Sequence, residues 1–268
     1  MMTMTSSSSS VFGINAFDSF VRVECANSEI RSMLERYIFP PLPHSPSFAA
    51  SPDISLWVQQ SQQEFRVLIN HELVASAPSI RDATLAAVKA LDDAVVHRFS
   101  KLRAVHAGAV IIDGGALILP GSTHAGKSSL VAELLKRGAS HLSDEYALID
   151  RQGCVHAYPR PLLLREGGRS QSLTLPTDLN ASFAEGHSVP VRWILSTSFT
   201  SDSTWDVREM SQGEAVMLLL RNTPHALAQT PDLVDQFLRV AANAVCYEGT
   251  RGDAVTAVDN VLALIRSK

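Results

Sequence analysis

Residues 116–128 read Ala-Leu-Ile-Leu-Pro-Gly-Ser-Thr-His-Ala-Gly-Lys-Ser. The apolar first part of this stretch predicts a strand, and its last eight residues match the pattern G-x-x-x-x-G-K-[ST]. Glycines let backbone N–H groups wrap a polyphosphate, the lysine adds a charge for the β- and γ-phosphates, and the serine hydroxyl can ligate Mg²⁺. The stretch therefore predicts an α/β domain with a phosphate-binding loop (P-loop). The residues expected to bind the nucleotide are Gly121, Ser122, Thr123, His124, Ala125, Gly126, Lys127, Ser128 and Ser129.

The sequence around the loop fits this reading. Before it, Asp113-Gly114 joins two apolar runs, Val105–Ile112 and Ala116–Leu119, which is typical of a tight hairpin. After it, Lys127–Arg137 has helical spacing and ends at Gly138, the usual stop residue. The remaining elements expected after the helix are strands at 141–149, 154–158 and 191–198, a strand at 206–210 pairing with 191–198, a mobile loop at 165–188, and helices at 211–220, 230–245 and 252–266.

An acidic pair follows the loop at the next expected strand, in Ser143-Asp144-Glu145. Adjacent carboxylates beside a P-loop can hold Mg²⁺, directly or through water, and can accept the proton of an attacking hydroxyl. Taken alone, the pair could also be a solvated strand edge. Beside a P-loop we expect catalytic roles for Lys127, Asp144 and Glu145, with Ser128 and Asp144 as metal ligands.

Other polar residues have two interpretations each. His106, on a predicted strand, is either structural or part of the site, and His124 either touches phosphate or faces solvent. Arg160 can contact the phosphates or the substrate, or can be a surface or packing arginine. Arg251 can lie near a nucleotide, or can be an ordinary turn residue. The histidines and cysteines form no metal-binding pattern.

These residues together resemble the catalytic domain of bacterial HPr kinase/phosphorylase and its HPr-kinase-like relatives. The resemblance rests on His106-Ala-Gly, which lies 21 residues before Lys127, on the loop itself, on Lys136-Arg137-Gly138 and on Ser143-Asp144-Glu145. It covers about residues 103–150 and is only general beyond 160. It implies a mixed-sheet, phosphoenolpyruvate-carboxykinase-like nucleotide fold, ATP and Mg²⁺ as cofactors, and His106 in the active site.

The resemblance has departures. The family's proton acceptor is the second acid of the pair and is an aspartate, whereas Glu145 is one methylene longer, so either Asp144 or Glu145 can be the base. The family's downstream metal-binding glutamate has one weak counterpart, Glu166, and the arginine-containing segment linked to phosphorylase activity has no clear match.

The chain is expected to divide into three parts. Residues 1–12, rich in serine, predict a disordered tail; residues 13–100 predict a small α+β module; and residues 101–268 predict the P-loop catalytic domain. In the module, the expected elements are a strand at 20–25, a short helix capped by Ser28, a proline-rich loop or linker at 40–52, a hairpin at 65–77 and a helix capped by Ser79.

Composition excludes several classes of protein. Hydrophobic residues make up 46% of the 268 residues and charged residues 19%, which excludes a mainly disordered chain. The net charge of −4 and the lack of a basic cluster argue against nucleic acid, and no apolar run is long enough for a membrane span. Three scattered cysteines and the absence of a signal-peptide pattern predict a cytoplasmic protein. A homo-oligomer is left open.

The function that this sequence favours is an ATP-dependent kinase that phosphorylates a serine hydroxyl of a protein or peptide, its expected partner. Two alternatives stay open: a small-molecule kinase on the same scaffold, and a nucleotide-binding regulatory or adaptor protein with little turnover.

Overall fold

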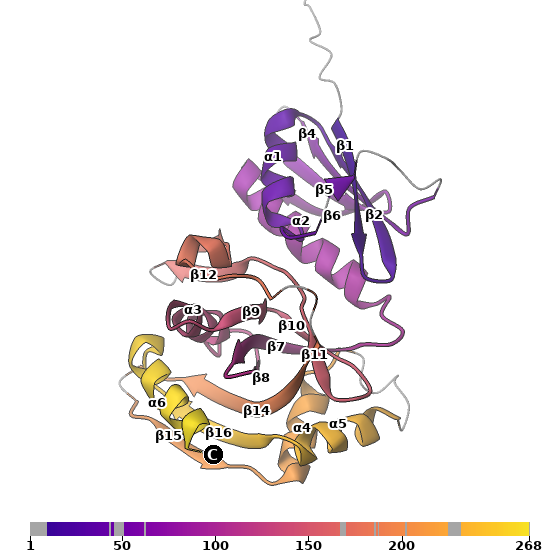
Figure 1. The fold of residues 1–268 in the computed structure, drawn as a ribbon. Helices are drawn as coiled ribbons and strands as arrows, with labels where there is room; N and C mark the ends of the chain where they lie inside the picture. The colour runs from indigo at the N-terminus through magenta and orange to yellow at the C-terminus, as the bar shows by residue number, and fades with distance from the viewer. Residues whose placement is uncertain are drawn as a thin grey trace, which may run out of the picture. The chain divides into compact units, whose positions relative to one another are not determined.

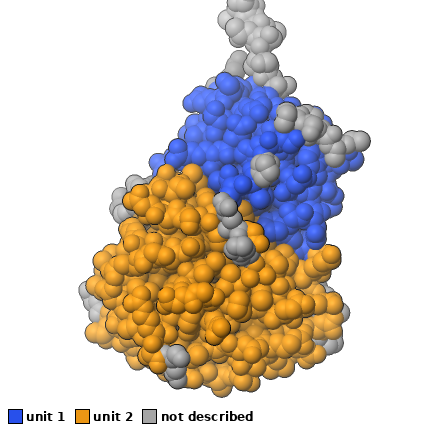
Figure 2. Space-filling model, viewed as in Figure 1, with its two compact units in different colours: residues 1–99 blue, residues 100–268 orange. Residues whose placement is uncertain are grey.

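The computed structural model has a mixed α/β fold and describes residues 10–42, 44–45, 51–61, 63–166, 170–184, 186, 188–201, 203–224 and 232–267. The chain forms two compact units, Met1–Phe99 and Ser100–Lys268, which Figure 2 shows in separate colours. None of the helices in these described stretches has the length and apolar character that crossing a membrane requires.

The first unit is a six-stranded sheet with two helices (Figure 1). Strand β2 pairs in parallel with β4, and the other neighbours are antiparallel. The strand order is β3-β1-β2-β4-β5-β6. The elements are β1 (Ser10–Ala16), β2 (Ser19–Cys25), α1 (Ser28–Tyr37), β3 (His44–Ser45), β4 (Ile54–Gln60), β5 (Phe65–Ile69), β6 (Glu72–Ala77) and α2 (Ile80–Val96).

Local sequence explains both helix starts in this unit. The side chain of Ser79 accepts a hydrogen bond from the backbone N–H of Asp82 and caps α2, as the sequence predicts. Helix α1 is capped by Asn27 rather than Ser28, because the Asn27 side chain accepts from the Ile30 N–H. The cap therefore lies one residue earlier than expected.

Two sequence predictions in this unit are wrong. Strand β1 begins at Ser10, inside the range 1–12 predicted as a tail, because alternate residues from Phe12 are buried and the strand pairs with β2. The proline-rich range 40–52 contains the short strand β3, and it is followed by a strand that was not predicted, β4. In both places serine and proline content concealed a strand.

The second unit is built on an eight-stranded mixed sheet. The main order is β11-β10-β7-β8-β14-β16-β15, with β9 paired to β7; β14 runs parallel to both β8 and β16. A separate hairpin comprises β12 and β13. The strands are β7 (Arg103–Ile112), β8 (Gly115–Pro120), β9 (Ser140–Ser143), β10 (Tyr146–Ile149), β11 (Cys154–His156), β12 (Leu162–Glu166), β13 (Ser170–Thr174), β14 (Ser188–Phe199), β15 (Asp206–Glu209) and β16 (Val245–Arg251).

The helices of this unit cover both faces of its sheet. Alternate residues of β8 enter different cores: Leu117 packs in the cluster with α3 and α6, and Ile118 in the cluster with α4 and α5. Because β8 is buried on both faces, it reads as a continuous apolar run in the sequence. The helices are α3 (Lys127–Lys136), α4 (Gln212–Arg221), α5 (Asp232–Ala242) and α6 (Ala254–Arg266), with a 3₁₀ turn at Pro176–Leu179.

Several expectations for this unit need correction. The strand expected at 141–149 is two strands, interrupted at the acidic pair, and the loop expected at 165–188 contains the end of β12, all of β13 and the 3₁₀ turn. Strand β15 pairs with β16 rather than with β14. The helix predicted at 230–245 ends at Ala242, as α5. Val245, which fits the helical spacing of apolar residues in the sequence, is instead the first residue of β16. The predicted helix start at Thr230-Pro231 lies outside the described residues.

Candidate functional site

The loop predicted to bind phosphate (the P-loop of the sequence prediction) lies between the carboxyl end of β8 and the start of α3. The hairpin that delivers β8 turns at Asp113 and Gly114, both with positive φ, as the sequence predicts. Gly126 is the N-cap of α3, with a left-handed φ of 79° and no side-chain hydrogen bond to the helix. The first-turn N–H groups of α3 therefore have no side-chain cap, which leaves them available to an anion.

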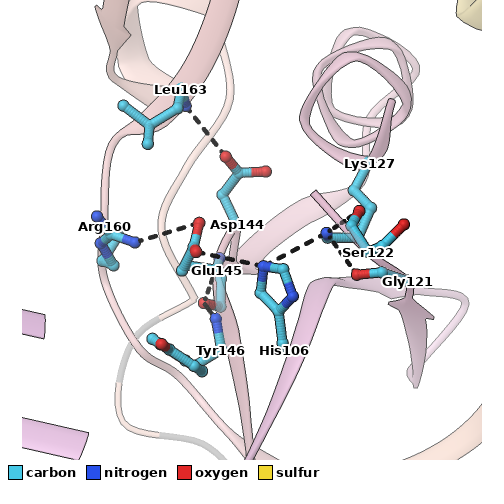
Figure 3. Close-up of polar contacts among 10 residues, drawn as sticks. His106, Gly121, Ser122, Lys127, Asp144, Glu145, Tyr146, Arg160 and Leu163 are labelled. Atoms are coloured by element: carbon cyan, nitrogen blue, oxygen red, sulfur yellow. Dashed lines mark hydrogen bonds and ion pairs between the residues drawn. The ribbon is translucent and has the colours of Figure 1, made fainter. Parts of the chain in front are cut away.

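The ammonium group of Lys127 is folded onto its own loop. Its Nζ donates to the carbonyl oxygens of Gly121 at 2.8 Å and Ser122 at 3.1 Å, and lies 3.5 Å from Nε2 of His106 (Figure 3). Burial lowers the pKa of Lys127, opposed by the negative charges of Glu145 and Asp144. A phosphate group bound here would give the Lys127 ammonium a charged acceptor in place of the two carbonyl oxygens.

His106 and Glu145 come together across neighbouring strands. His106 lies on β7, opposite Tyr146 of β10, and the carbonyl of Glu145 accepts from the N–H of Ala107 at 3.0 Å. This register places Nε2 of His106 3.2 Å from Oε1 of Glu145. The structure thus brings together three of the residues that the sequence predicts for the site, His106, Lys127 and Glu145.

Arg160 approaches Glu145 from the segment between β11 and β12. The arginine is only 2% exposed, and its Nη1 lies 3.7 Å from Oε2 of Glu145. Burial alone would raise the pKa of Glu145, but the hydrogen bond from His106 and the charges of Arg160 and Lys127 outweigh it and lower that pKa. Glu145 is therefore held as a carboxylate between cationic or donor groups.

Asp144 has a different environment from its neighbour. It is 2% exposed, and its Oδ2 accepts from the N–H of Leu163 at 3.0 Å. Burial raises the pKa of Asp144 to about 6, even though Leu163 and the side chain of Ser128 act to lower it. Its Oδ1 is buried and has no hydrogen-bond partner among the described residues.

These properties of Asp144 and Ser128 fit a magnesium ion. A buried carboxylate oxygen without a partner is a costly arrangement that a cation would relieve, and the Ser128 hydroxyl is close by. Within the described stretches, no group of three or more His, Cys, Asp or Glu could hold a metal. Mg²⁺ that arrives with a nucleotide usually needs only one or two carboxylates, because phosphates and waters complete its shell.

Arg251 supports the P-loop from the end of β16. It is 1% exposed, and its Nη2 donates to the carbonyl of Gly126 at 2.7 Å and that of Ala125 at 3.4 Å. Its Nε donates to Oγ1 of Thr197 at 3.2 Å. The sequence allowed Arg251 to be either a nucleotide contact or an ordinary turn residue. In the structure its guanidinium instead donates to backbone carbonyls of the loop.

Some predicted site residues are not drawn into this network. His124 is exposed with a φ of 75°, and no side-chain contact of His124 is found in the described part of the chain. Ser122, Thr123 and Ser129 are exposed at the loop surface. The side chain of Glu166, the weak metal candidate, lies outside what the structure describes.

Sequence reasoning singled out Arg160 without connecting it to Glu145. Its partner is set by the path of the chain after β11, which no local motif encodes. The one available signal was a lone arginine between two prolines in an apolar segment.

Comparison with known proteins finds likenesses among solved structures, but none among family models or curated sequences. No protein-family model matches the chain, and no curated protein matches it significantly. Among solved structures, the Hpr(Ser) kinase/phosphatase from Coxiella burnetii is similar at 14% identity and a TM-score of 0.33, over 62% of this chain and 95% of that chain. A likeness this distant bears on neither the activity nor the substrate of this chain.

Proposed function

We propose that this chain is an ATP-dependent phosphotransferase that moves the γ-phosphate to a serine hydroxyl of a protein or peptide. One observation carries the proposal: the P-loop lysine, His106 and Glu145 form a contiguous polar group, with Asp144 beside Ser128. The motifs shared with HPr-kinase-like proteins support the serine substrate, the phosphoenolpyruvate-carboxykinase-like P-loop fold, and a cytoplasmic location where ATP is found.

The loop would bind the polyphosphate through its backbone N–H groups and the N-terminus of α3. Lys127 would leave the carbonyls of Gly121 and Ser122 and contact the terminal phosphates. Ser128 and Asp144 would hold Mg²⁺, which neutralises charge on the β- and γ-phosphates when bound. Most of the rate would come from positioning and electrostatics, since phosphoryl transfer needs little covalent help from the protein.

Between the two acids, we assign the base role to Glu145. Its pKa is lowered, so it is ionised and can accept the hydroxyl proton, and it is the acid that contacts His106. Asp144 is buried next to Ser128 and bonded to Leu163, which suits a metal ligand better than a group that meets substrate. The longer side chain of Glu145, compared with the aspartate of the resembling family, would extend that carboxylate towards His106.

Two isosteric variants separate these roles. Asp144→Asn should weaken binding of Mg²⁺–ATP while leaving binding of ATP in EDTA nearly unchanged. Glu145→Gln should bind Mg²⁺–ATP like the wild type, but should lower transfer from γ-³²P-ATP by roughly 10²–10⁴-fold, the range for a lost general base. Calorimetry supplies the binding data, and phosphoamino-acid analysis of the labelled product tests for phosphoserine.

The same assays address the alternatives. Label on a metabolite but on no protein or peptide would favour a small-molecule kinase. Tight ATP binding with no transfer by the wild type would favour an adaptor with little turnover. Transfer by Glu145→Gln at the wild-type rate would contradict the base assignment.

A further inference from the structure

Phe199 is an exposed aromatic residue beside the P-loop. It is the last residue of β14 and is 45% exposed, while Leu195, four residues earlier, is buried in the core cluster with α3. A Cβ atom built on Gly126 would lie 3.5 Å from the Cβ of Phe199. An apolar ring at this position can cover a ligand that the loop holds.

The sheet topology explains this position. Strands β8, β14 and β16 are parallel, so their carboxyl ends share one edge of the sheet (Figure 1). The P-loop follows β8, Phe199 ends β14 and Arg251 ends β16, with Phe199 and Arg251 paired in register. In α/β sheets, ligands bind at this carboxyl edge.

The backbone that presents Phe199 is fixed in place. The N–H of Thr200 donates to the carbonyl of Arg251 at 3.0 Å, and the N–H of Ser203 donates to the carbonyl of Thr200 at 3.2 Å. Arg251 in turn binds both Thr197, on β14, and the carbonyl of Gly126. The ring is therefore attached to the same rigid network as the loop, and little ordering would be needed for it to contact a ligand.

The direction of the bound nucleotide follows from the proposed function, on which this inference rests. Lys127, His106 and Glu145 mark the end of the loop that faces β7 and β10, where the terminal phosphate would lie. Strand β14 lies on the other side of β8. A triphosphate that extends away from the catalytic end therefore brings its nucleoside towards β14.

We propose that Phe199 is the stacking platform for the nucleobase of the bound triphosphate. Bases stack on aromatic side chains through their π faces, and stacking tolerates any base because every base has such a face. The predicted contribution is to affinity and placement of the nucleoside, and the chemistry at Glu145 does not depend on it directly.

The experiment compares ATP with inorganic tripolyphosphate, which has the phosphates but no base. Dissociation constants of both ligands are measured by calorimetry for wild type, Phe199→Ala and Phe199→Trp. The matched control is Leu238→Ala, an exposed apolar residue of α5, which packs on the opposite face of the sheet. Because Phe199 is already exposed, the alanine variant should fold, and Phe199→Trp keeps a stacking ring.

The expected result is that Phe199→Ala raises the dissociation constant of ATP about tenfold and leaves that of tripolyphosphate unchanged. Phe199→Trp should retain ATP affinity, with its fluorescence quenched by ATP and not by tripolyphosphate. An equal effect of Phe199→Ala on both ligands, or no effect on either, would overturn the platform while the P-loop assignment stands. A wild-type protein that binds neither ligand would refute the proposed function and this inference together.

Discussion

His106 and Glu145 meet across two strands, with Nε2 of the imidazole 3.2 Å from Oε1 of the carboxylate. The same Nε2 lies 3.5 Å from Nζ of Lys127, so one histidine is in reach of both the proposed base and the P-loop cation. We interpret His106 as the group that orients Glu145. A residue of this kind contributes by holding geometry rather than by reacting.

Replacing His106 should therefore slow transfer more than it weakens ATP binding. His106→Ala is expected to lower kcat by roughly tenfold to a hundredfold, because an unsupported carboxylate samples unproductive positions. His106→Gln, with an amide N–H that can reach Glu145, should recover part of the loss. Steady-state kinetics with both variants tests this; a change confined to the KM for ATP would contradict it.

Arg160 should set the pH range in which Glu145 is ionised. Its charge helps to lower the pKa of Glu145, so Arg160→Met should raise that pKa and move the acid limb of the kcat profile to higher pH. Arg160→Lys should shift the limb less. The control is Arg239→Met, at an exposed position of α5. A limb at the same pH in Arg160→Met and wild type would disprove the assignment.

Asp144 should lower the stability of the apo protein more at neutral pH than in acid. Burial raises its pKa in the folded chain to about 6, from 3.8 for an ordinary aspartate. Between those values the folded state keeps the proton that the unfolded state has released, so this carboxyl's contribution to stability falls as pH rises, and the penalty stays in full above about pH 6.

Asp144→Asn removes that penalty. In EDTA at pH 8 the variant should be more stable than wild type by on the order of 2 kcal/mol, and the difference should vanish towards pH 4. Thermal unfolding across this range measures it, with the exposed Asp206→Asn as control. A difference between Asp144→Asn and wild type that is the same at pH 4 and pH 8 would be inconsistent with a buried carboxylate at neutral pH.

Gly126 and Arg251 should be energetically coupled. A Cβ on Gly126 would lie 2.5 Å from Nη2 of Arg251, and the glycine has a φ of 79°. Gly126→Ala and Arg251→Met should each weaken ATP binding, and Arg251→Met should also destabilise the fold by about 2–4 kcal/mol, because the carbonyls of Ala125 and Gly126 lose a buried charged donor.

The double variant should be less damaged than the sum of the two single changes, because methionine removes the guanidinium that the new methyl group would strike. A double-mutant cycle on unfolding free energies measures this coupling. Strict additivity would indicate that Arg251 does not fix the conformation of the loop at Gly126.

The parts of the site that depend on local sequence could be predicted. The hairpin at Asp113-Gly114, the loop at Gly121–Ser128 and helix α3 depend on turn chemistry and periodicity within a few residues. The grouping of His106 with Lys127 was predicted from the spacing in a resembling family, and the two side chains lie 3.5 Å apart.

The parts that could not be predicted depend on contacts between distant segments. Arg251 reaches the loop because β16 lies beside β14. Strand β16 was not predicted, because it comes directly after a segment with helical spacing. The break between β9 and β10 at Asp144 and Glu145 gives the two acids different environments, although they are neighbours and look equivalent in the sequence. Burial raises the pKa of Asp144, whereas His106, Arg160 and Lys127 lower that of Glu145, and no local sequence pattern shows these partners.

Lys127 and Glu145 are proposed to act in one phosphotransfer site, and a labelling assay tests this. The protein is incubated with γ-³²P-ATP, Mg²⁺ and a pool of serine-containing peptides, and phosphoserine is quantified for wild type, Lys127→Met and Glu145→Gln. We predict label on serine with the wild type and a loss of at least about a hundredfold in both variants. Undiminished phosphoserine with Lys127→Met, or no label on any peptide with the wild type, would contradict the account.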